Sequence, residues 1–284
     1  MKNVVLNSVL VAFVLLAASC GKQPEAIVNV MSFNIRLDHV ADSMNNWKYR
    51  KENAAKMIAY YAPDIIGMQE VVKNQLDDLK NRLPQYIALG VGRADGKEKG
   101  EYCSLFYKAN RFELVKGGNF GLSETPGSIG VKGWDAACER IVTWAVLKDK
   151  ISGKKLAVFN THFDHIGKIA RRESAKLLSK KIHEIAGNLP VVVTGDFNGT
   201  ANSEPIVLLT EKDLKNACSD ATIVYGPAWS FHDFGRIPLE NRQLIDFIFV
   251  NELITVDKFR VISDKPDDGY LSDHAPIMAG LTFH

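Results

Sequence analysis

Residues 190–198 read Pro-Val-Val-Val-Thr-Gly-Asp-Phe-Asn, and this stretch decides the class of fold. Three consecutive valines after a proline predict a short strand that is buried on both faces, because a β-branched run without polar alternation suits the middle of a covered sheet. The run continues directly into Gly195 and Asp196. The pattern therefore predicts a rigid sheet that carries polar side chains at the ends of its strands.

Strand-like apolar runs recur along the chain, and helix-like stripes separate some of them. Helices are predicted at residues 47–61 and 168–186, where apolar side chains return every three or four positions. Strands outnumber helices, and this balance predicts an α/β sandwich with its helices packed outside. The predicted strands cover residues 27–35, 65–68, 86–91, 103–107, 112–115, 141–147, 156–161, 191–194, 245–250, 255–261 and 275–281.

Residues 1–19 predict an export signal rather than part of the fold. Lys2 precedes an apolar run over residues 4–18, and small residues lead to Cys20. The run is shorter than the roughly 18 apolar residues expected of a membrane-spanning helix. It resembles a bacterial lipoprotein signal, so the expected protein is exported and anchored to a bacterial membrane, in the periplasm or at the cell surface, through lipidated Cys20. A secretory signal cleaved nearby is the alternative.

Composition predicts a single globular domain over residues 27–284, after a short linker at residues 20–26. The chain has 284 residues, of which 46% are hydrophobic, and contains no visible repeat or low-complexity tract. Its formal net charge of +2 gives no general attraction to nucleic acid, so any affinity for a polyanion must be local.

Three cysteines would remain in the mature protein, and an odd number cannot pair completely. Cys103 and Cys138 either form a bridge or, as the preferred interpretation, stay small buried thiols like Cys218.

Six segments join an apolar strand to an unusually polar end, and together they predict a catalytic site. An Asp or Asn at one strand end is more often a turn former than a catalyst, but six such ends in one chain are hard to explain as turns. The segments contain Asn34, Glu70, the stretch 160–165, the stretch 194–198, Asp246 and the stretch 271–276.

Hydrolysis of a phosphate ester would use these residue types. Mg²⁺ neutralises charge on phosphoryl oxygens and prefers carboxylates and water as ligands. Glu70 and Asp273 are the expected ligands, with Asn34 as a neutral neighbour. Asp196 and Asn198 stand two positions apart on a turn, so both would address one water or one phosphate oxygen.

Histidine completes the predicted chemistry. It titrates near neutrality and can donate to a phosphate, but its ring must be held by a carboxylate. Asp246 is the expected partner of His274.

The order of these motifs resembles the endonuclease/exonuclease/phosphatase superfamily, which includes deoxyribonuclease I. The resemblance runs from about residue 29 to residue 282. It is carried by Ser-Phe-Asn-Ile-Arg, Gln-Glu-Val, Asn-Thr-His, Gly-Asp-Phe-Asn, Ile-Asp-Phe-Ile and Ser-Asp-His-Ala-Pro. The resemblance implies a four-layered α/β sandwich, in which two packed mixed β-sheets are flanked by helices.

The resemblance also implies roles for the site residues. A Mg²⁺ ion, with Mn²⁺ as a substitute, would be held through Glu70 with Asn34 and Asp273 nearby. Asp196 would align or activate the attacking water. The remaining contacts to the scissile phosphate would come from Asn198 and His162, and from His274 paired with Asp246, which either polarises the phosphate or acts as the base.

Two less specific blocks extend the resemblance. Tyr102, which follows Glu101, would face the site or else be a core or rim aromatic. The Gly-rich stretch 121–140 would approach the substrate, with Trp134 and Arg140 as candidate contacts. Arg140 would alternatively pair with Glu139 or Asp135. Leu244 departs from the family pattern, because family members often carry Arg at this position, two residues before the aspartate of the Ile-Asp-Phe-Ile strand, which is Asp246 here.

The predicted function is metal-dependent hydrolysis of phosphate esters, with a phosphodiesterase or nuclease preferred. A phosphatase or phosphodiesterase for inositol, sugar or lipid-headgroup phosphates is the alternative, because one fold hosts many substrates. More remote are a hydrolase of another ester class and an inactive binding lipoprotein. The expected partners are a phosphate ester, nucleic acid among the candidates, and a membrane through the lipid anchor, with no protein partner implied.

Overall fold

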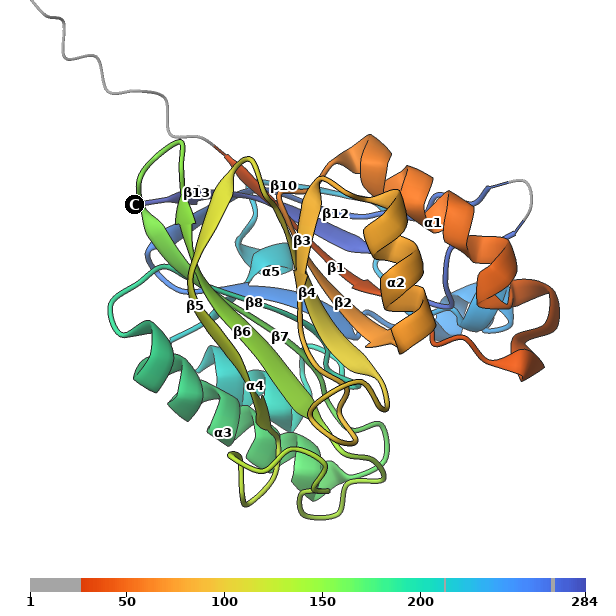
Figure 1. Cartoon of the computed structure of the whole chain (residues 1–284), viewed down its shortest axis with the longest axis horizontal. Helices are drawn as coiled ribbons and strands as arrows, with labels where there is room; N and C mark the ends of the chain where they lie inside the picture. Colours follow the sequence, from red (N-terminus) through yellow and green to blue (C-terminus); the bar gives the residue numbers. More distant parts are fainter. Residues whose placement is uncertain (1–26, 212, 267–268) are drawn as a thin grey trace, which may run out of the picture.

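The fold is an α/β sandwich of four layers. The computed structural model describes residues 27–211, 213–266 and 269–284, so the predicted signal peptide, the linker at residues 20–26 and lipidation at Cys20 lie outside the described residues. Two mixed β-sheets pack face to face, and helices cover the outer face of each (Figure 1). This is the predicted fold class.

The first sheet has seven strands in the order β10-β12-β13-β1-β2-β4-β3. Its strands β1 and β2 run parallel, with Asn34 opposite Gln69. Their C-terminal ends therefore meet at one edge of the sheet, which brings Asn34 beside Glu70. The strands are β1 (Val28–Asn34), β2 (Ile65–Val71), β3 (Tyr86–Leu89), β4 (Tyr102–Lys108), β10 (Ile223–Tyr225), β12 (Ile254–Val261) and β13 (Ile277–Phe283).

The second sheet has six strands in the order β5-β6-β7-β8-β11-β9. Strands β7 and β8 are parallel, with His162 opposite Asp196. Strand β11 is antiparallel to β8 and begins with Asp246, also opposite Asp196. Three predicted site residues thus come together by strand register alone. The strands are β5 (Phe112–Gly121), β6 (Ile141–Asp149), β7 (Lys155–His162), β8 (Val191–Asp196), β9 (Lys215–Asn216) and β11 (Asp246–Val250).

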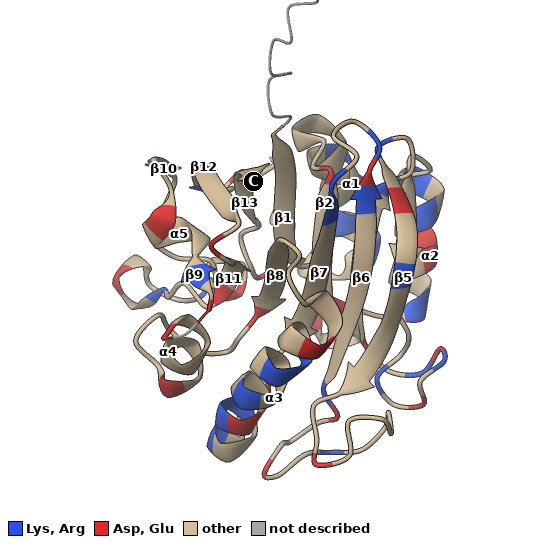
Figure 2. Cartoon of the chain, turned by 90° about the vertical axis from the view of Figure 1, so that its left-hand side faces the viewer, with Lys and Arg blue, Asp and Glu red and all other residues tan. Residues whose placement is uncertain are grey.

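Helices close both outer faces. Helices α1 (Trp47–Tyr61) and α2 (Lys73–Arg82) pack on the first sheet, and α3 (Lys168–Ala186) and α4 (Glu204–Thr210) pack on the second. Helix α3 presents Lys and Arg interspersed with Glu to solvent rather than a purely basic stripe (Figure 2). The remaining elements are helix α5 (Ala217–Asp220) and the 3₁₀ turns η1 (Val40–Asn45), η2 (Asp233–Gly235) and η3 (Leu239–Asn241).

Three buried apolar clusters fill the three spaces between the layers. The cluster between the sheets joins residues such as Ile65 of β2 to Val192 of β8. The two outer clusters include Ile58 of α1 and Leu178 of α3, each packed on its own sheet. Burial of this apolar surface is the main stabilisation of the fold, at roughly 25 cal/mol per Å².

The two predicted helices occur with the predicted bounds. The predicted strands shift by at most three residues at either end, except that β5 extends six residues beyond the predicted 112–115, and the short strands β9 and β10 were not predicted. Helix α2 was not predicted, because its sequence is mostly polar and it buries only Gln75 and Leu79. Within the described part of the chain, no helix has both the length and the apolar character that a membrane crossing requires.

Candidate active site

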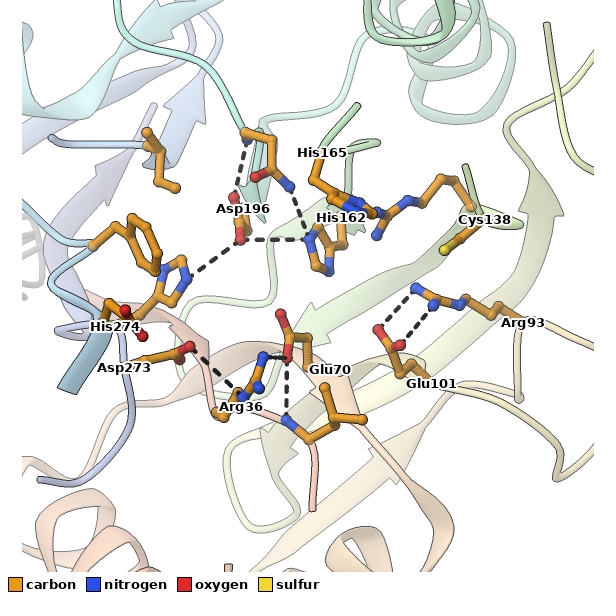
Figure 3. A pocket seen from close by; sticks show the side chains of 16 residues that line it. Arg36, Glu70, Arg93, Glu101, Cys138, His162, His165, Asp196, Asp273 and His274 are labelled. Atoms are coloured by element: carbon orange, nitrogen blue, oxygen red, sulfur yellow. Dashed lines mark hydrogen bonds and ion pairs between the residues drawn. The ribbon is translucent and has the colours of Figure 1, made fainter. Parts of the chain in front are cut away.

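A pocket of about 410 Å³ lies at the sheet edge where β1, β2, β7 and β8 end (Figure 3). Seven of the predicted site residues line it. They are Glu70, Arg140, His162, Asp196, Asn198, Asp273 and His274. Asn34 and Asp246 do not line the pocket but are hydrogen bonded to residues that do.

Asn34 links the two sheets at the floor of the site. Its side-chain nitrogen donates to Glu70 Oε1 at 3.0 Å and to Asp196 Oδ2 at 2.9 Å. Its side-chain oxygen accepts from the backbone N–H of Arg36 at 3.0 Å. Since that oxygen is engaged, Asn34 is arranged to hold the two carboxylates in place rather than to offer an oxygen to a cation.

Glu70 is delivered by an irregular end of β2. The pairing of β2 with β4 shifts register between Met68 and Val71, and Glu70 has a φ of 61°, in the left-handed region. A non-glycine residue there is uncommon and often marks a functional position. Glu70 Oε2 also accepts from the backbone N–H of Leu37 at 3.1 Å, which fixes the carboxylate.

Asp196 lies at the centre of the site. Its Oδ1 accepts from the backbone N–H of Asn198 at 2.9 Å. Its Oδ2 lies 3.4 Å from His162 Nε2 and 3.7 Å from His274 Nε2. Burial, and then the charge of Asp246, raise the pKa of Asp196 above its usual range.

His162 is a neutral imidazole. Asn198 Nδ2 lies 3.0 Å from His162 Nε2 and donates to the carbonyl of Phe163, also at 3.0 Å. The second contact identifies this atom as the amide nitrogen, and His162 Nε2 lies between it and Asp196 Oδ2, whereas His162 Nδ1 is buried without a hydrogen-bond partner. Burial, and then Arg140 and Arg93, lower the pKa of His162 well below its usual value.

His274 and Asp246 form the predicted pair. His274 Nδ1 lies 2.8 Å from Asp246 Oδ2, and both residues are buried. Burial opposes protonation of the ring, but Asp246 and Asp196 outweigh it and raise the pKa of His274. The pair therefore holds an imidazolium whose second nitrogen faces Asp196.

Asp273 and the end of β1 are joined by a buried arginine. Arg50 of α1 donates from Nη1 to the carbonyls of Ile35 at 2.7 Å and Leu271 at 2.9 Å. It thereby connects Ile35, which directly follows Asn34, to Leu271, which lies two positions before Asp273. A guanidinium suits this position because its donors spread in a fixed planar fork.

The opposite wall of the pocket is basic. Arg93 forms a two-bond ion pair with Glu101, with contacts of 2.8 and 2.5 Å. Arg140 Nε lies 3.2 Å from Asp164 Oδ2, and its Nη2 lies 3.0 Å from His165 Nδ1. Its Nη1 is buried without a hydrogen-bond partner. Arg140 thus pairs with neither Glu139 nor Asp135, the partners considered from sequence.

Two predicted substrate contacts do not line the pocket. Tyr102 is 2% exposed and its hydroxyl donates to the carbonyl of Lys97, so it behaves as a core aromatic. Trp134 has a φ of 52° and a backbone N–H that donates to Glu124, which places it in the loop outside the pocket lining.

Several lining residues were not assigned roles from sequence. Arg36 and His165 both stand inside quoted motifs, so proximity to Asn34 and His162 was the available signal. Arg93 and Cys138 lie in loops without a strand-end pattern, and only the folded chain brings them to the pocket. Cys103, Cys138 and Cys218 are free thiols, as the preferred interpretation expected, but only Cys103 is buried.

The donor set fits a divalent cation. The ligand atoms of Glu70, His162 and Asp196 lie within 4.8 Å of one another. Asp246 Oδ1 is buried without a hydrogen-bond partner, so the acidic cluster carries more negative charge than its hydrogen bonds satisfy. Carboxylate oxygens are the ligands that Mg²⁺ prefers. The sequence predicted Glu70 and Asp273 as the two carboxylate ligands, whereas the side chains whose ligand atoms lie near that of Glu70 are those of Asp196 and His162.

Two packed mixed sheets bring carboxylates and histidines together at one edge. This combination of fold and site is the one expected of a hydrolase of phosphate esters. The chain matches the Endonuclease/Exonuclease/phosphatase family over residues 31–274. It therefore belongs to that family, as the motifs predicted.

Solved structures support this assignment. The chain is 46% identical to an endonuclease/exonuclease/phosphatase from Bacteroides vulgatus, with a TM-score of 0.89, and the match covers 92% of this chain and 100% of the other. It is 36% identical to a mannosyl-6-phosphatase from Bacteroides thetaiotaomicron, with a TM-score of 0.86 and coverage of 90% and 100%.

A curated relative is more distant. Carbon catabolite repressor protein 4 homolog 5 of Arabidopsis thaliana is 26% identical over 190 residues, which cover 63% of this chain and 41% of the relative. The chain thus spans less than half the length of the first curated relatives that it matches.

Proposed function

We propose that this protein is a Mg²⁺-dependent phosphatase that acts on small phosphate monoesters. The observation that carries the proposal is the division of one pocket into an acidic wall, with Glu70, Asp196 and Asp273, and a wall with two arginines, Arg93 and Arg140, of which Arg93 is paired with Glu101. The acidic wall suits a cation and the basic wall suits an anionic phosphate, so a phosphate ester would lie between them.

The side chains divide the chemical work. A bound Mg²⁺ would supply charge neutralisation on the phosphoryl oxygens, held through Glu70 with Asp196 close by. Asp196 would orient the attacking water and accept its proton. His274, held by Asp246, would donate a hydrogen bond to a phosphoryl oxygen as negative charge builds up.

Asn198 and His162 would contact the phosphate from the other side. The backbone N–H of Asn198 is engaged by Asp196, and its side chain is aligned by the Phe163 carbonyl. This fixed geometry supports a role in positioning, because a donor that is already oriented costs no reorganisation during the reaction.

The choice of a small monoester over a nucleic acid rests on the pocket wall. Phe231 is the only Phe, Tyr or Trp among the residues that line this pocket, and single-stranded nucleic acid is usually gripped by stacking on several aromatic rings. The unpartnered Nη1 of Arg140 would suit the extra negative charge of a monoester. The mannosyl-6-phosphatase that the chain resembles makes a sugar phosphate the first substrate to test.

The test is a substrate comparison with the purified protein. Mannose 6-phosphate, other hexose phosphates, inositol phosphates, bis-p-nitrophenyl phosphate and oligonucleotides are supplied with Mg²⁺, and each reaction is repeated with chelator. The proposal expects chelator-sensitive release of phosphate from monoesters, at least about tenfold faster per enzyme than diester cleavage. Faster cleavage of oligonucleotides would favour the nuclease alternative, and hydrolysis that ignores the chelator would reject metal dependence.

We also propose lipid anchoring at Cys20 of an exported protein, which rests on the sequence of residues 1–20 alone. The mass of the mature N-terminus from a bacterial membrane fraction tests it. A diacylglyceryl cysteine at position 20 is expected, and an unmodified N-terminus elsewhere would reject the anchor.

A further inference from the structure

We propose that Arg36 is a fixed cation of the active site that limits the site to one divalent metal ion. The inference rests on the proposed metal dependence and goes beyond it, because it concerns how many ions are bound and which residue sets that number.

Arg36 lies between two acidic residues of the pocket. Its Nη1 is 3.9 Å from Glu70 Oε2, and its Nε is 3.8 Å from Asp273 Oδ2 (Figure 3). Two-metal phosphoesterases bind their ions about 3.5–4 Å apart between shared carboxylates. The guanidinium therefore occupies the region between Glu70 and Asp273 in which a second ion would find its ligands.

The side chain of Arg36 is held in this position. Asp42 accepts from Arg36 Nε and Nη2, both at 3.0 Å, in a two-bond ion pair. Asp42 is itself buried, which limits solvent screening of the pair. A guanidinium held by two hydrogen bonds along its Nε–Nη2 edge is poorly placed to swing away when a cation arrives.

The backbone of Arg36 is fixed as well. Its φ is 57°, in the left-handed region, and its N–H donates to Asn34. Its carbonyl accepts from Arg50 Nη2 at 3.1 Å and from Gln75 Nε2 at 2.8 Å. Three neighbours therefore determine the position of this residue, and its charge is permanent because a guanidinium keeps its proton in proteins.

Two other groups of possible metal ligands among the described residues already contain a fixed side chain of the protein. Cys138, Asp164 and His165 form the first, and Arg140 occupies it, with Nε 3.2 Å from Asp164 and Nη2 3.0 Å from His165. The second consists of Asp196, Asp246 and His274. The ring of His274 lies between Asp246 and Asp196, with its two nitrogens 2.8 and 3.7 Å from their oxygens. An ion shared by those two carboxylates would have to displace the ring. The positions of Arg36 and His274 are therefore compatible with one divalent ion, near Glu70 and Asp196.

The experiment counts bound Mn²⁺ by calorimetric titration and by electron paramagnetic resonance, without substrate. It compares the purified wild-type protein with Arg36→Met and Arg36→Lys. Arg82→Met is the matched control, because Arg82 also pairs with two carboxylates, Glu52 and Asp78, on the outer helices. Circular dichroism melting verifies that each variant is folded.

One Mn²⁺ per chain is expected for the wild type, Arg36→Lys and Arg82→Met. Two are expected for Arg36→Met, together with the broadened or spin-coupled signal of neighbouring Mn²⁺ ions.

Two ions in the wild type, or one in Arg36→Met, would overturn the inference and leave the proposed function standing. If the wild type bound no Mn²⁺ and its activity ignored chelator, the proposed metal dependence itself would fail. If Arg36→Met did not fold, Arg36→Gln would take its place, with two Mn²⁺ expected and a count of one overturning the inference.

Discussion

The space between the two sheets has two ends of opposite character. At the end where β1, β2 and β8 begin, the facing side chains are apolar, for example Val28, Ile65 and Val192. At the end where the same strands finish, the facing side chains are polar and still buried, for example Asn34, Asn160 and Asp196. A single strand such as β2 therefore contributes to the apolar core with Ile65 and to the active site with Glu70.

The difference shows how the fold separates stability from chemistry. The apolar end stabilises by removing surface from water, which does not depend on exact geometry. At the polar end, hydrogen bonds between buried groups hold the side chains in fixed geometry, and a buried group that loses its partner destabilises the fold. Asn160 is an example of such a network. Its side-chain nitrogen donates to the carbonyls of Met68 and Ser104, and its side-chain oxygen accepts from Gln69 and Thr194.

The largest expected effect is at the polar end of β2. Glu70→Gln preserves shape but removes the charge proposed to hold the metal, so we expect activity to fall about 10³-fold, equivalent to several kcal/mol of transition-state stabilisation. The midpoint of thermal unfolding should stay the same or rise, because a negative charge leaves a crowded acidic cluster. Steady-state kinetics and thermal melting measure the two effects. Unchanged activity would remove Glu70 from the mechanism.

The counterpart at the apolar end of β2 should behave in the opposite way. Ile65→Ala leaves a cavity between the sheets, and we expect it to lower the free energy of unfolding by about 2–5 kcal/mol. The turnover number per folded molecule should change less than threefold at 25 °C. Urea denaturation and active-site-normalised kinetics test this. A large loss of turnover in the folded variant would mean that the two ends are not independent.

Asn160 lies where the two ends meet, so its replacement should affect both properties. Asn160→Ala leaves several buried groups without partners, and we expect about 1–3 kcal/mol of destabilisation. A roughly tenfold loss of activity should accompany it, because the hydrogen bonds of Asn160 no longer connect β2 to β8 near Glu70 and Asp196. Thr194→Val, which removes one of the four bonds, is the milder control. An effect on stability alone would show that the catalytic carboxylates are held by other contacts.

The smallest effect concerns thiol reactivity. Cys103 is buried, and burial raises the pKa of its thiol to about 12, whereas Cys138 is partly exposed at the pocket. Iodoacetamide at pH 8 should modify Cys138 and leave Cys103 intact in the folded protein, because only the thiolate reacts. Mass spectrometry of the digested protein reads out both sites. Equal modification of the two thiols would contradict the burial of Cys103.

Sequence patterns predicted the fold and the centre of the site for a common reason. Asn34, Glu70 and Asp196 follow directly on short buried strands, and strand ends in one sheet meet at one edge. The bulge that turns Glu70 towards the pocket was not predictable, because it depends on pairing with β4. Trp134 was proposed as a substrate contact from its Gly-rich loop, but it does not line the pocket. Tyr102 was proposed from the resemblance either to face the site or to be a core or rim aromatic, and the second alternative holds.

The wall with Arg93 and Arg140 was predicted only in part. Arg140 was a candidate contact from sequence, but Arg93 comes from a different loop, and the acidic partners Glu101 and Asp164 that orient the two arginines are ordinary acidic residues in the sequence. Helix α2 was missed because its burial is slight. Both cases reflect long-range contacts that no local period or motif encodes.

The most direct test of a metal-centred phosphatase site is anomalous diffraction from crystals soaked in Mn²⁺. We expect one anomalous peak per chain, within about 2.0–2.3 Å of a Glu70 carboxylate oxygen, that disappears in Glu70→Gln crystals treated in the same way. A peak bound elsewhere, or one that persists in the Glu70→Gln crystals, would contradict the assignment of this sheet edge as the metal site.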